Sequence, residues 1–211
     1  MKAAGIALPL LALAAGPALA GAQKYEPLAA SVQAALHAAV SDHRPPLSSF
    51  QTPMEAVDWL EDMSARIARR LPDRKTRLDF LRTVHYEAKR AGLDPQLVLA
   101  LIQVESGFKK YAVSSAGARG FMQVMPFWIG LIGTGSDNLF HLRTNLRYGC
   151  TILKHYLEIE KGDLFRALGR YNGSLGQPGY PEAVRAAWQR QWLYDPDAKS
   201  RTTRQGQSGK P

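Results

Sequence analysis

The strongest constraint on the fold of this chain is an apolar run, Leu97 to Val104, that ends in Glu105-Ser106-Gly107. Asp94 and Pro95 before it are typical of a helix N-cap and of the first helical position, and Gly107 suits a left-handed C-cap. Because the run is apolar on every side, the helix that it predicts lies inside the hydrophobic core. A carboxyl group at the end of such a helix resists ionisation, so it can donate a proton near neutral pH.

Helical spacing of apolar residues recurs along the rest of the chain, and alternating runs are few. We therefore predict a mainly α fold with at most a minimal β element, a short strand or turn at Phe121–Val124. The other predicted helices span Ser31–Val40, Pro53–Leu71, Arg74–Ala91, Asn145–Glu158, Asp163–Tyr171 and Pro181–Trp192.

Shifts in composition predict four parts along the 211 residues. They are a signal peptide (1–20), an N-terminal helical appendage (21–72), a main domain (73–193) and a disordered basic tail (194–211). Lys2, a short apolar stretch and the small residues Ala18 and Ala20 predict a secretory signal cleaved after Ala20. The tail is polar and basic, and such a composition cannot bury a core.

The expected location of the mature chain is the periplasm or the outside of the cell. The apolar stretch of the signal falls short of the ~20 residues that a membrane-spanning helix needs, so we expect no integral membrane segment after cleavage. No cysteine closely follows Ala20 to accept a lipid anchor. Cys150 is the only cysteine, which rules out an intrachain disulfide, and we expect it to pack as a small apolar residue.

The formal charge of +9 favours an anionic partner or serves solubility. For an exported protein the relevant polyanion is the cell wall or a membrane surface. The sequence carries no helix-turn-helix, zinc-finger or aromatic-basic strand pattern, so we expect no nucleic-acid partner.

Two further motifs follow the buried glutamate: Gly120-Phe121-Met122-Gln123-Val124-Met125-Pro126 and Tyr171-Asn172-Gly173. In order and approximate spacing, the three motifs resemble the soluble lytic transglycosylase (SLT) domain family, which is related to goose-type lysozyme. The resemblance covers roughly Arg74 to Trp192. Other segments that follow the family pattern are Ser114–Ala118, Leu139-Phe140, Asn145-Leu146 and Gly149.

The resemblance implies a lysozyme-like helical catalytic domain that cleaves peptidoglycan glycan strands and needs no cofactor. In the family, one glutamate, here Glu105, protonates the glycosidic oxygen between N-acetylmuramic acid and N-acetylglucosamine. It then removes the proton of the muramoyl C6 hydroxyl, which attacks the anomeric carbon and leaves a 1,6-anhydro end. The implied second catalytic residue is Tyr171, with its hydroxyl directed toward Glu105.

The resemblance also implies a set of substrate contacts: Ser106, Met122, Gln123 and Asn172. Met122 is expected to pack on a sugar, and the Gln123 amide to bridge sugar hydroxyls or an acetamido group.

The chain departs from the family at three places. Arg170 stands where alanine is common and Ser174 where glycine is common. A further tyrosine that many members carry after the last motif is absent, with Ala186 and Ala187 in that region. The arginine could alter the charge of the substrate cleft.

Two assignments remain open at this stage. Glu158, Glu160 and Asp163 have structural explanations at helix ends, but Asp137 lies in a loop and is a second candidate for the acid. Phe127 and Trp128 are either core residues or an aromatic platform for a sugar ring.

A metal site is not predicted, because the five histidines never stand four residues apart and no cysteine pair exists. We expect a monomer. Two rival functions remain: a hydrolytic muramidase on the same fold, and a catalytically silent wall-binding protein.

Overall fold

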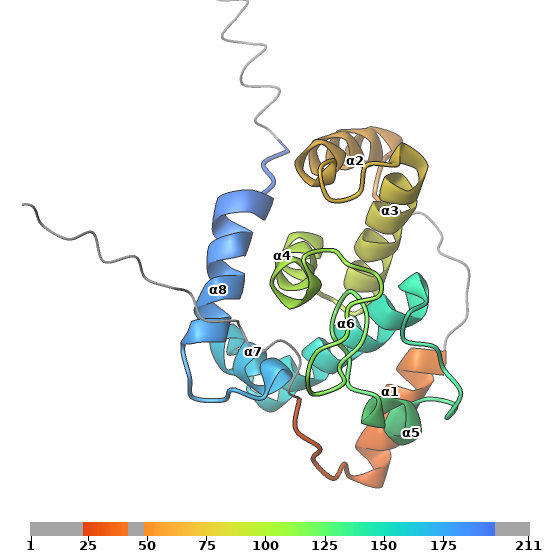
Figure 1. Ribbon diagram of the computed structural model, residues 1–211, viewed down its shortest axis with the longest axis vertical. Coiled ribbons are helices and arrows are strands. Elements are labelled where there is room, and N and C mark those ends of the chain that lie inside the picture. Colours follow the sequence, from red (N-terminus) through yellow and green to blue (C-terminus); the bar gives the residue numbers. More distant parts are fainter. Residues whose placement is uncertain (1–22, 42–48, 197–211) are drawn as a thin grey trace, which may run out of the picture.

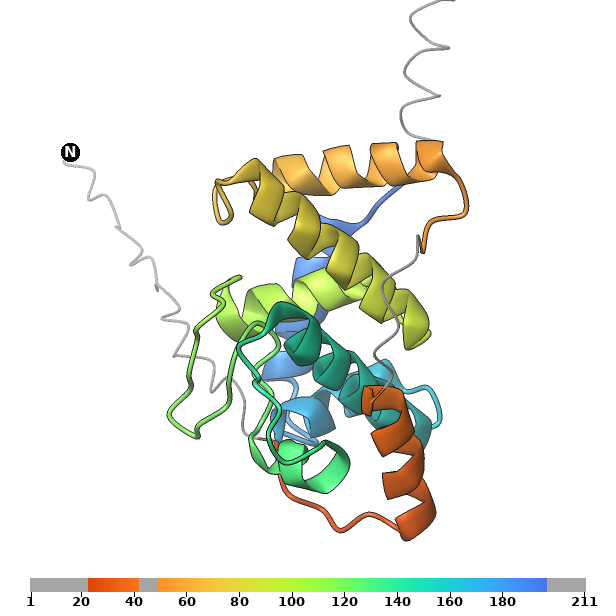
Figure 2. The same cartoon turned by 90° about the vertical axis from the view of Figure 1, so that its right-hand side faces the viewer.

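The computed structural model describes residues 23–41 and 49–196, and within these ranges it is mainly helical (Figures 1 and 2). The predicted signal peptide and most of the predicted tail lie outside the described residues. The helices are α1 (Ala30–Ser41), α2 (Pro53–Ile67), α3 (Arg74–Arg90), α4 (Pro95–Ser106), α5 (Phe127–Ile132), α6 (Leu142–Ile159), α7 (Leu164–Asn172), α8 (Gly179–Ala187) and the π-helical turn η1 (Trp188–Trp192).

Helix α4 lies at the centre of the molecule, as its apolar composition predicts (Figure 1). The Asp94 carboxylate accepts hydrogen bonds from the backbone N–H groups of Gln96 and Leu97, and Gly107 ends the helix with φ +56°. Helices α3 and α8 and the turn η1 pack against α4. The fold thereby holds the C-terminal end of α4 away from water.

Helix α6 joins the two halves of this arrangement, because it packs against both α3 and α7. A buried ion-pair cluster links it to α3. The fully buried carboxylate of Glu87 on α3 accepts hydrogen bonds from Arg147 at 2.9 Å and Arg143 at 3.4 Å, both on α6, and from Arg90 at 3.0 Å. Burial of this carboxylate is tolerated because three guanidinium groups surround it.

The β content of the described residues is limited to isolated bridges, Val113 with Arg119 and Arg119 with Val124. They lie in the loop between α4 and α5, so the predicted minimal β element is confirmed. The mainly α prediction is confirmed as well.

The N-terminal segments pack on the main domain. Helix α1 contacts α5 and α6, and α2 contacts α3 (Figure 2). The Arg66 guanidinium on α2 also donates hydrogen bonds to the carbonyl oxygens of Gln191, at 2.8 Å, and Leu193, at 2.9 Å. These contacts tie both ends of the described chain to the same core.

Several helix bounds differ from the sequence expectation: α2 ends at Ile67 and not at Leu71, and α6 begins at Leu142 and not at Asn145. The helix predicted for Pro181–Trp192 begins earlier, at Gly179, and its last turn is π-helical. Helix α5 was not predicted, because its six residues include a glycine and are too few to show a helical period. None of the helices in the described ranges is long and apolar enough to cross a membrane.

Candidate active site

Glu105 lies in the last turn of α4 and is only 5% exposed. Its Oε1 atom accepts a hydrogen bond of 2.5 Å from the Tyr180 hydroxyl. Its Oε2 atom is buried and has no hydrogen-bond partner within the described part of the chain. One carboxyl oxygen is therefore held in place, and the hydrogen-bonding capacity of the other is unused within the described residues.

The environment of Glu105 favours the neutral acid. Burial raises its pKa from 4.5 to about 8, and the hydrogen bond from Tyr180 opposes this shift only in part. Among the residues that the structure describes, no second carboxylate contributes to the shift. At neutral pH the carboxyl group is therefore mostly protonated and can donate a proton.

Tyr180 is the functional residue that the sequence analysis missed. It lies in the first turn of α8, which packs against α4, and its side chain is buried. Burial and the nearby charge of Glu105 raise its pKa far above the usual value, so the hydroxyl remains a donor. The tyrosine precedes Pro181, the residue at which the sequence predicted the helix to start. The sequence analysis took the family's tyrosine after the last motif to be absent, but Tyr180 follows that motif, so this part of the family pattern is the signal that could have identified it.

Tyr171, on α7, is completely buried. Its hydroxyl donates a hydrogen bond of 2.8 Å to the carbonyl oxygen of Met122, whereas the resemblance implied that it points to Glu105. The two side chains are nonetheless neighbours. Burial is the main reason why the pKa of Tyr171 is raised, and the charge of Glu105 is the next.

Ser106 and Asn145 fix the loop that faces Glu105. The Ser106 hydroxyl donates to the carbonyl oxygens of Phe121, at 2.8 Å, and of Ile102. The buried Asn145 amide accepts from the backbone N–H of Met122 at 2.8 Å and also donates to two loop carbonyl groups. Ser106 was predicted to contact substrate; here its hydroxyl holds the loop backbone.

Gln123 holds the same loop from within. Its amide donates to the carbonyl oxygens of Gly120, at 2.9 Å, and Ala112, at 3.1 Å. The residue has φ +48°, a left-handed conformation that non-glycine residues adopt rarely. The amide predicted to bridge sugar groups is thus engaged with the backbone of its own loop.

Met122 is 0% exposed, so it offers no side-chain surface to a sugar in this structure. It packs against α6 at Gly149, where an added Cβ atom would come within 2.4 Å of the Met122 sulfur atom. Glycine at this position therefore permits the close approach of loop and helix. Asn172 is buried at the end of α7, next to Tyr171.

The charge of Arg170 is balanced by two acidic residues. Its guanidinium forms an ion pair with Glu160, and a second one with Glu26 of the N-terminal segment at 3.2 Å. Ion pairing therefore offsets the change in charge that the sequence led us to expect from this arginine.

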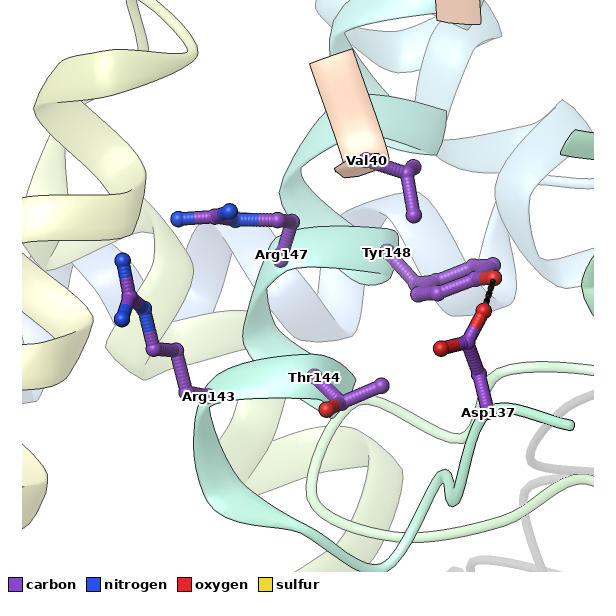
Figure 3. Close-up of a pocket in the computed structure, with 6 residues that line it drawn as sticks. All are labelled: Val40, Asp137, Arg143, Thr144, Arg147 and Tyr148. Atoms are coloured by element: carbon purple, nitrogen blue, oxygen red, sulfur yellow. Dashed lines mark hydrogen bonds between the residues drawn. The ribbon is translucent and has the colours of Figure 1, made fainter. Parts of the chain in front are cut away.

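Asp137, the second candidate for the acid, belongs to another pocket (Figure 3). Its carboxylate accepts hydrogen bonds from the Tyr148 hydroxyl at 2.6 Å and from the backbone N–H of Thr134 at 3.0 Å. The guanidinium groups of Arg143 and Arg147, which also line this pocket, point away from Asp137 (Figure 3). Asp137 thus orders the loop before α6, and its carboxylate is bound by Tyr148 and Thr134.

Of the two aromatic residues at the start of α5, Trp128 is buried, and its indole N–H donates to the Gln23 side chain at 3.0 Å. It is a core residue. Phe127 is half-buried and packs edge-to-face on Tyr25, with 5.7 Å between ring centroids.

The chain is similar in sequence to known proteins. The family model described as "Transglycosylase SLT domain" matches residues 82–187. The chain is 51% identical over 47 residues to membrane-bound lytic murein transglycosylase C of Actinobacillus pleuropneumoniae serotype 5b, covering 22% of this chain and 13% of that protein. It is 30% identical over 103 residues to the transglycosylase of Enterobacteria phage PRD1, covering 49% of this chain and 38% of that protein.

The class of protein is defined by a mainly helical, lysozyme-like fold with a buried glutamate at the end of its central helix. Because the family model spans half of its length, the chain belongs to the Transglycosylase SLT domain family. The chain spans only 13% and 38% of the lengths of these two relatives.

Proposed function

We propose that this protein is a peptidoglycan lytic transglycosylase that cleaves the β-1,4 bond between N-acetylmuramic acid and N-acetylglucosamine. The observation that carries the proposal is the state of Glu105. Its carboxyl group is buried, its pKa is raised to about 8, one oxygen is bound by Tyr180, and the other has no described partner. A carboxyl group in this state is suited to donate a proton to a buried glycosidic oxygen.

In the first step, Glu105 donates its proton through Oε2 to the glycosidic oxygen, and the bond to the anomeric carbon breaks. The N-acetylglucosamine part leaves with this proton. The Tyr180 hydroxyl stabilises the carboxylate that forms, because a hydrogen bond to a charged acceptor is about twice as strong as one to a neutral acceptor.

In the second step, the Glu105 carboxylate accepts the proton of the muramoyl C6 hydroxyl. The C6 oxygen bonds to the anomeric carbon, which closes the 1,6-anhydro ring and returns Glu105 to its neutral form. Water is not consumed. Because the nucleophile is the C6 hydroxyl of the substrate itself, the reaction needs no second carboxyl group at the site.

No second described carboxylate contributes to the pKa of Glu105, which favours this reaction over hydrolysis by a retaining pair of carboxyl groups. Retaining glycosidases place two carboxyl groups ~5–5.5 Å apart, and inverting ones ~6.5–9.5 Å apart. In the retaining arrangement, the charge of the second group would act on the pKa of the first. Within the described chain, the Glu105 pKa is set by burial and by Tyr180.

Analysis of the reaction products distinguishes the transglycosylase from its rivals. Purified sacculi are digested in water enriched in heavy oxygen, and the fragments are analysed by mass spectrometry. A transglycosylase gives 1,6-anhydromuramoyl ends without the heavy isotope. A muramidase gives reducing ends that carry it, and a wall-binding protein releases no fragments. Either of the latter results would contradict the proposal.

We further propose that the protein acts in the periplasm or outside the cell, as a monomer, after removal of residues 1–20. This rests on the composition of the N-terminal stretch and on a substrate that lies outside the cytoplasmic membrane. N-terminal sequencing of the exported protein should begin at Gly21, and a retained Met1 would contradict the assignment.

A further inference from the structure

Gln23 is buried near the start of the described chain, although the three residues that follow it are exposed. Its side chain is 4% accessible. The Oε1 atom accepts hydrogen bonds from the indole N–H of Trp128, at 3.0 Å, and from the backbone N–H of Met125, at 3.3 Å. The Nε2 atom donates to the carbonyl oxygen of Gln123 at 3.5 Å.

The same loop is joined to the other side of the candidate active site. The Tyr171 hydroxyl on α7, whose pKa the Gln23 amide lowers slightly, donates to the carbonyl oxygen of Met122. Gln23 therefore holds a loop that is hydrogen-bonded both to Ser106, next to Glu105, and to Tyr171.

The loop needs such external contacts to keep its shape. Gln123 has φ +48°, and a non-glycine residue in the left-handed region persists only where its surroundings hold it. The Gln123 side chain donates to the carbonyl oxygen of Gly120 and so secures the preceding turn. Gln23 donates to the carbonyl oxygen of Gln123 and accepts from the backbone N–H of Met125.

We propose that Gln23 is a positioning residue for the proposed reaction: its amide fixes the 123–125 backbone, in the loop that is hydrogen-bonded to Ser106 and to Tyr171. The inference rests on the proposed function. The proposal gives the N-terminal segment a role in positioning the groups around Glu105, whereas the sequence predicts only that this segment begins a helical appendage. Gln23 itself contacts neither Glu105 nor the reacting atoms.

The test compares Gln23→Met and Gln23→Ala with a matched control, Gln33→Met. Gln33 also belongs to the N-terminal segment, and its amide donates to the carbonyl oxygen of Leu131 at 2.7 Å, but it touches neither the 122–125 backbone nor Tyr171. Both Gln23 variants should fold, since the residue lies at the edge of the chain and outside the hydrophobic core cluster.

The assay is the release of anhydro products from soluble glycan fragments, with kcat and KM determined separately below the melting temperature of every variant. A small misplacement at a catalytic site can lower the rate about 100-fold. We expect both Gln23 variants to lose about 10- to 100-fold in kcat, with KM changed less than about threefold. Gln33→Met should retain the wild-type kcat.

Three results would overturn the positioning role alone: a Gln23→Met kcat within about twofold of wild type, an equal loss in Gln33→Met, or a loss that disappears on cooling. The last two would mean that Gln23 only anchors the N-terminal segment. A wild-type protein that releases no product would instead contradict the proposed function, and the positioning role with it.

Discussion

Replacing Glu105 by glutamine should change the pH dependence of stability, apart from any effect on activity. The native pKa of Glu105 is about 8, whereas its ordinary value is 4.5. Folding therefore favours the protonated form. The stability associated with this protonation is fully present below pH 4.5 and is lost as the pH rises through 8. The amide that replaces the carboxyl group in Glu105→Gln is neutral at every pH, so the variant does not lose this stability.

The magnitude follows from the shift in pKa. One pKa unit corresponds to about 1.4 kcal/mol, so the wild type should lose roughly 4 kcal/mol relative to Glu105→Gln between pH 5 and pH 8. For a protein of this size, 1 kcal/mol corresponds to about 2–4 °C in Tm. The Tm difference between variant and wild type should therefore grow by roughly 10 °C over this range.

Thermal unfolding of both proteins, followed by circular dichroism at matched pH values, measures this difference. Other titrating groups cancel because the two chains differ at one position. Glu182→Gln, which changes an exposed carboxylate on α8, provides the reference for a substitution outside the site. A Tm difference that stays constant from pH 5 to pH 8 would refute the reasoning, since Glu105 would then ionise like an exposed acid.

Three further predictions concern neighbours of Glu105. Tyr180→Phe removes the hydrogen bond that lowers the Glu105 pKa, so the alkaline limb of the pH–rate profile, near pH 8 in the wild type, should move to higher pH; an unmoved limb counts against this contact. Tyr171→Phe leaves the Met122 carbonyl oxygen without its donor, and we expect about 1 kcal/mol lower stability in urea unfolding and roughly tenfold slower turnover. Wild-type values for both would show that this hydroxyl is dispensable. Gly149→Ala places a Cβ atom against Met122, so the free energy of unfolding should fall by about 1–3 kcal/mol, and an unchanged value would mean that the loop yields without cost.

The sequence was most informative where local chemistry decides the structure. The apolar run before Glu105, the cap at Asp94 and the glycine at 107 predicted a buried central helix that ends in a protonated acid, and α4 has these properties. The other long helices were predicted with small differences at their ends, because helical periodicity is strong over ten residues or more.

The contacts of the site could not be predicted in the same way. Tyr180 and Gln23 reach it from segments far apart in the sequence, and a hydrogen bond between distant segments leaves no periodic signal. The residues of the middle motif illustrate the same limit. The sequence identified Met122 and Gln123 as important, but only the structure shows that one is fully buried and that the other holds its own loop.

The most direct test of the central claim compares wild type and Glu105→Gln on purified sacculi, measuring release of anhydromuropeptides and binding to the sacculi in parallel. Glutamine keeps the shape of the side chain but can neither donate nor accept the proton that moves in each step. Positioned acid–base groups contribute about 10²–10⁴-fold, so we expect the variant to lose at least 10²-fold in release and to bind as the wild type does. If Glu105→Gln cleaved sacculi at the wild-type rate, another residue would be the acid, with Asp137 the first to test, and the account given for Glu105 would be wrong.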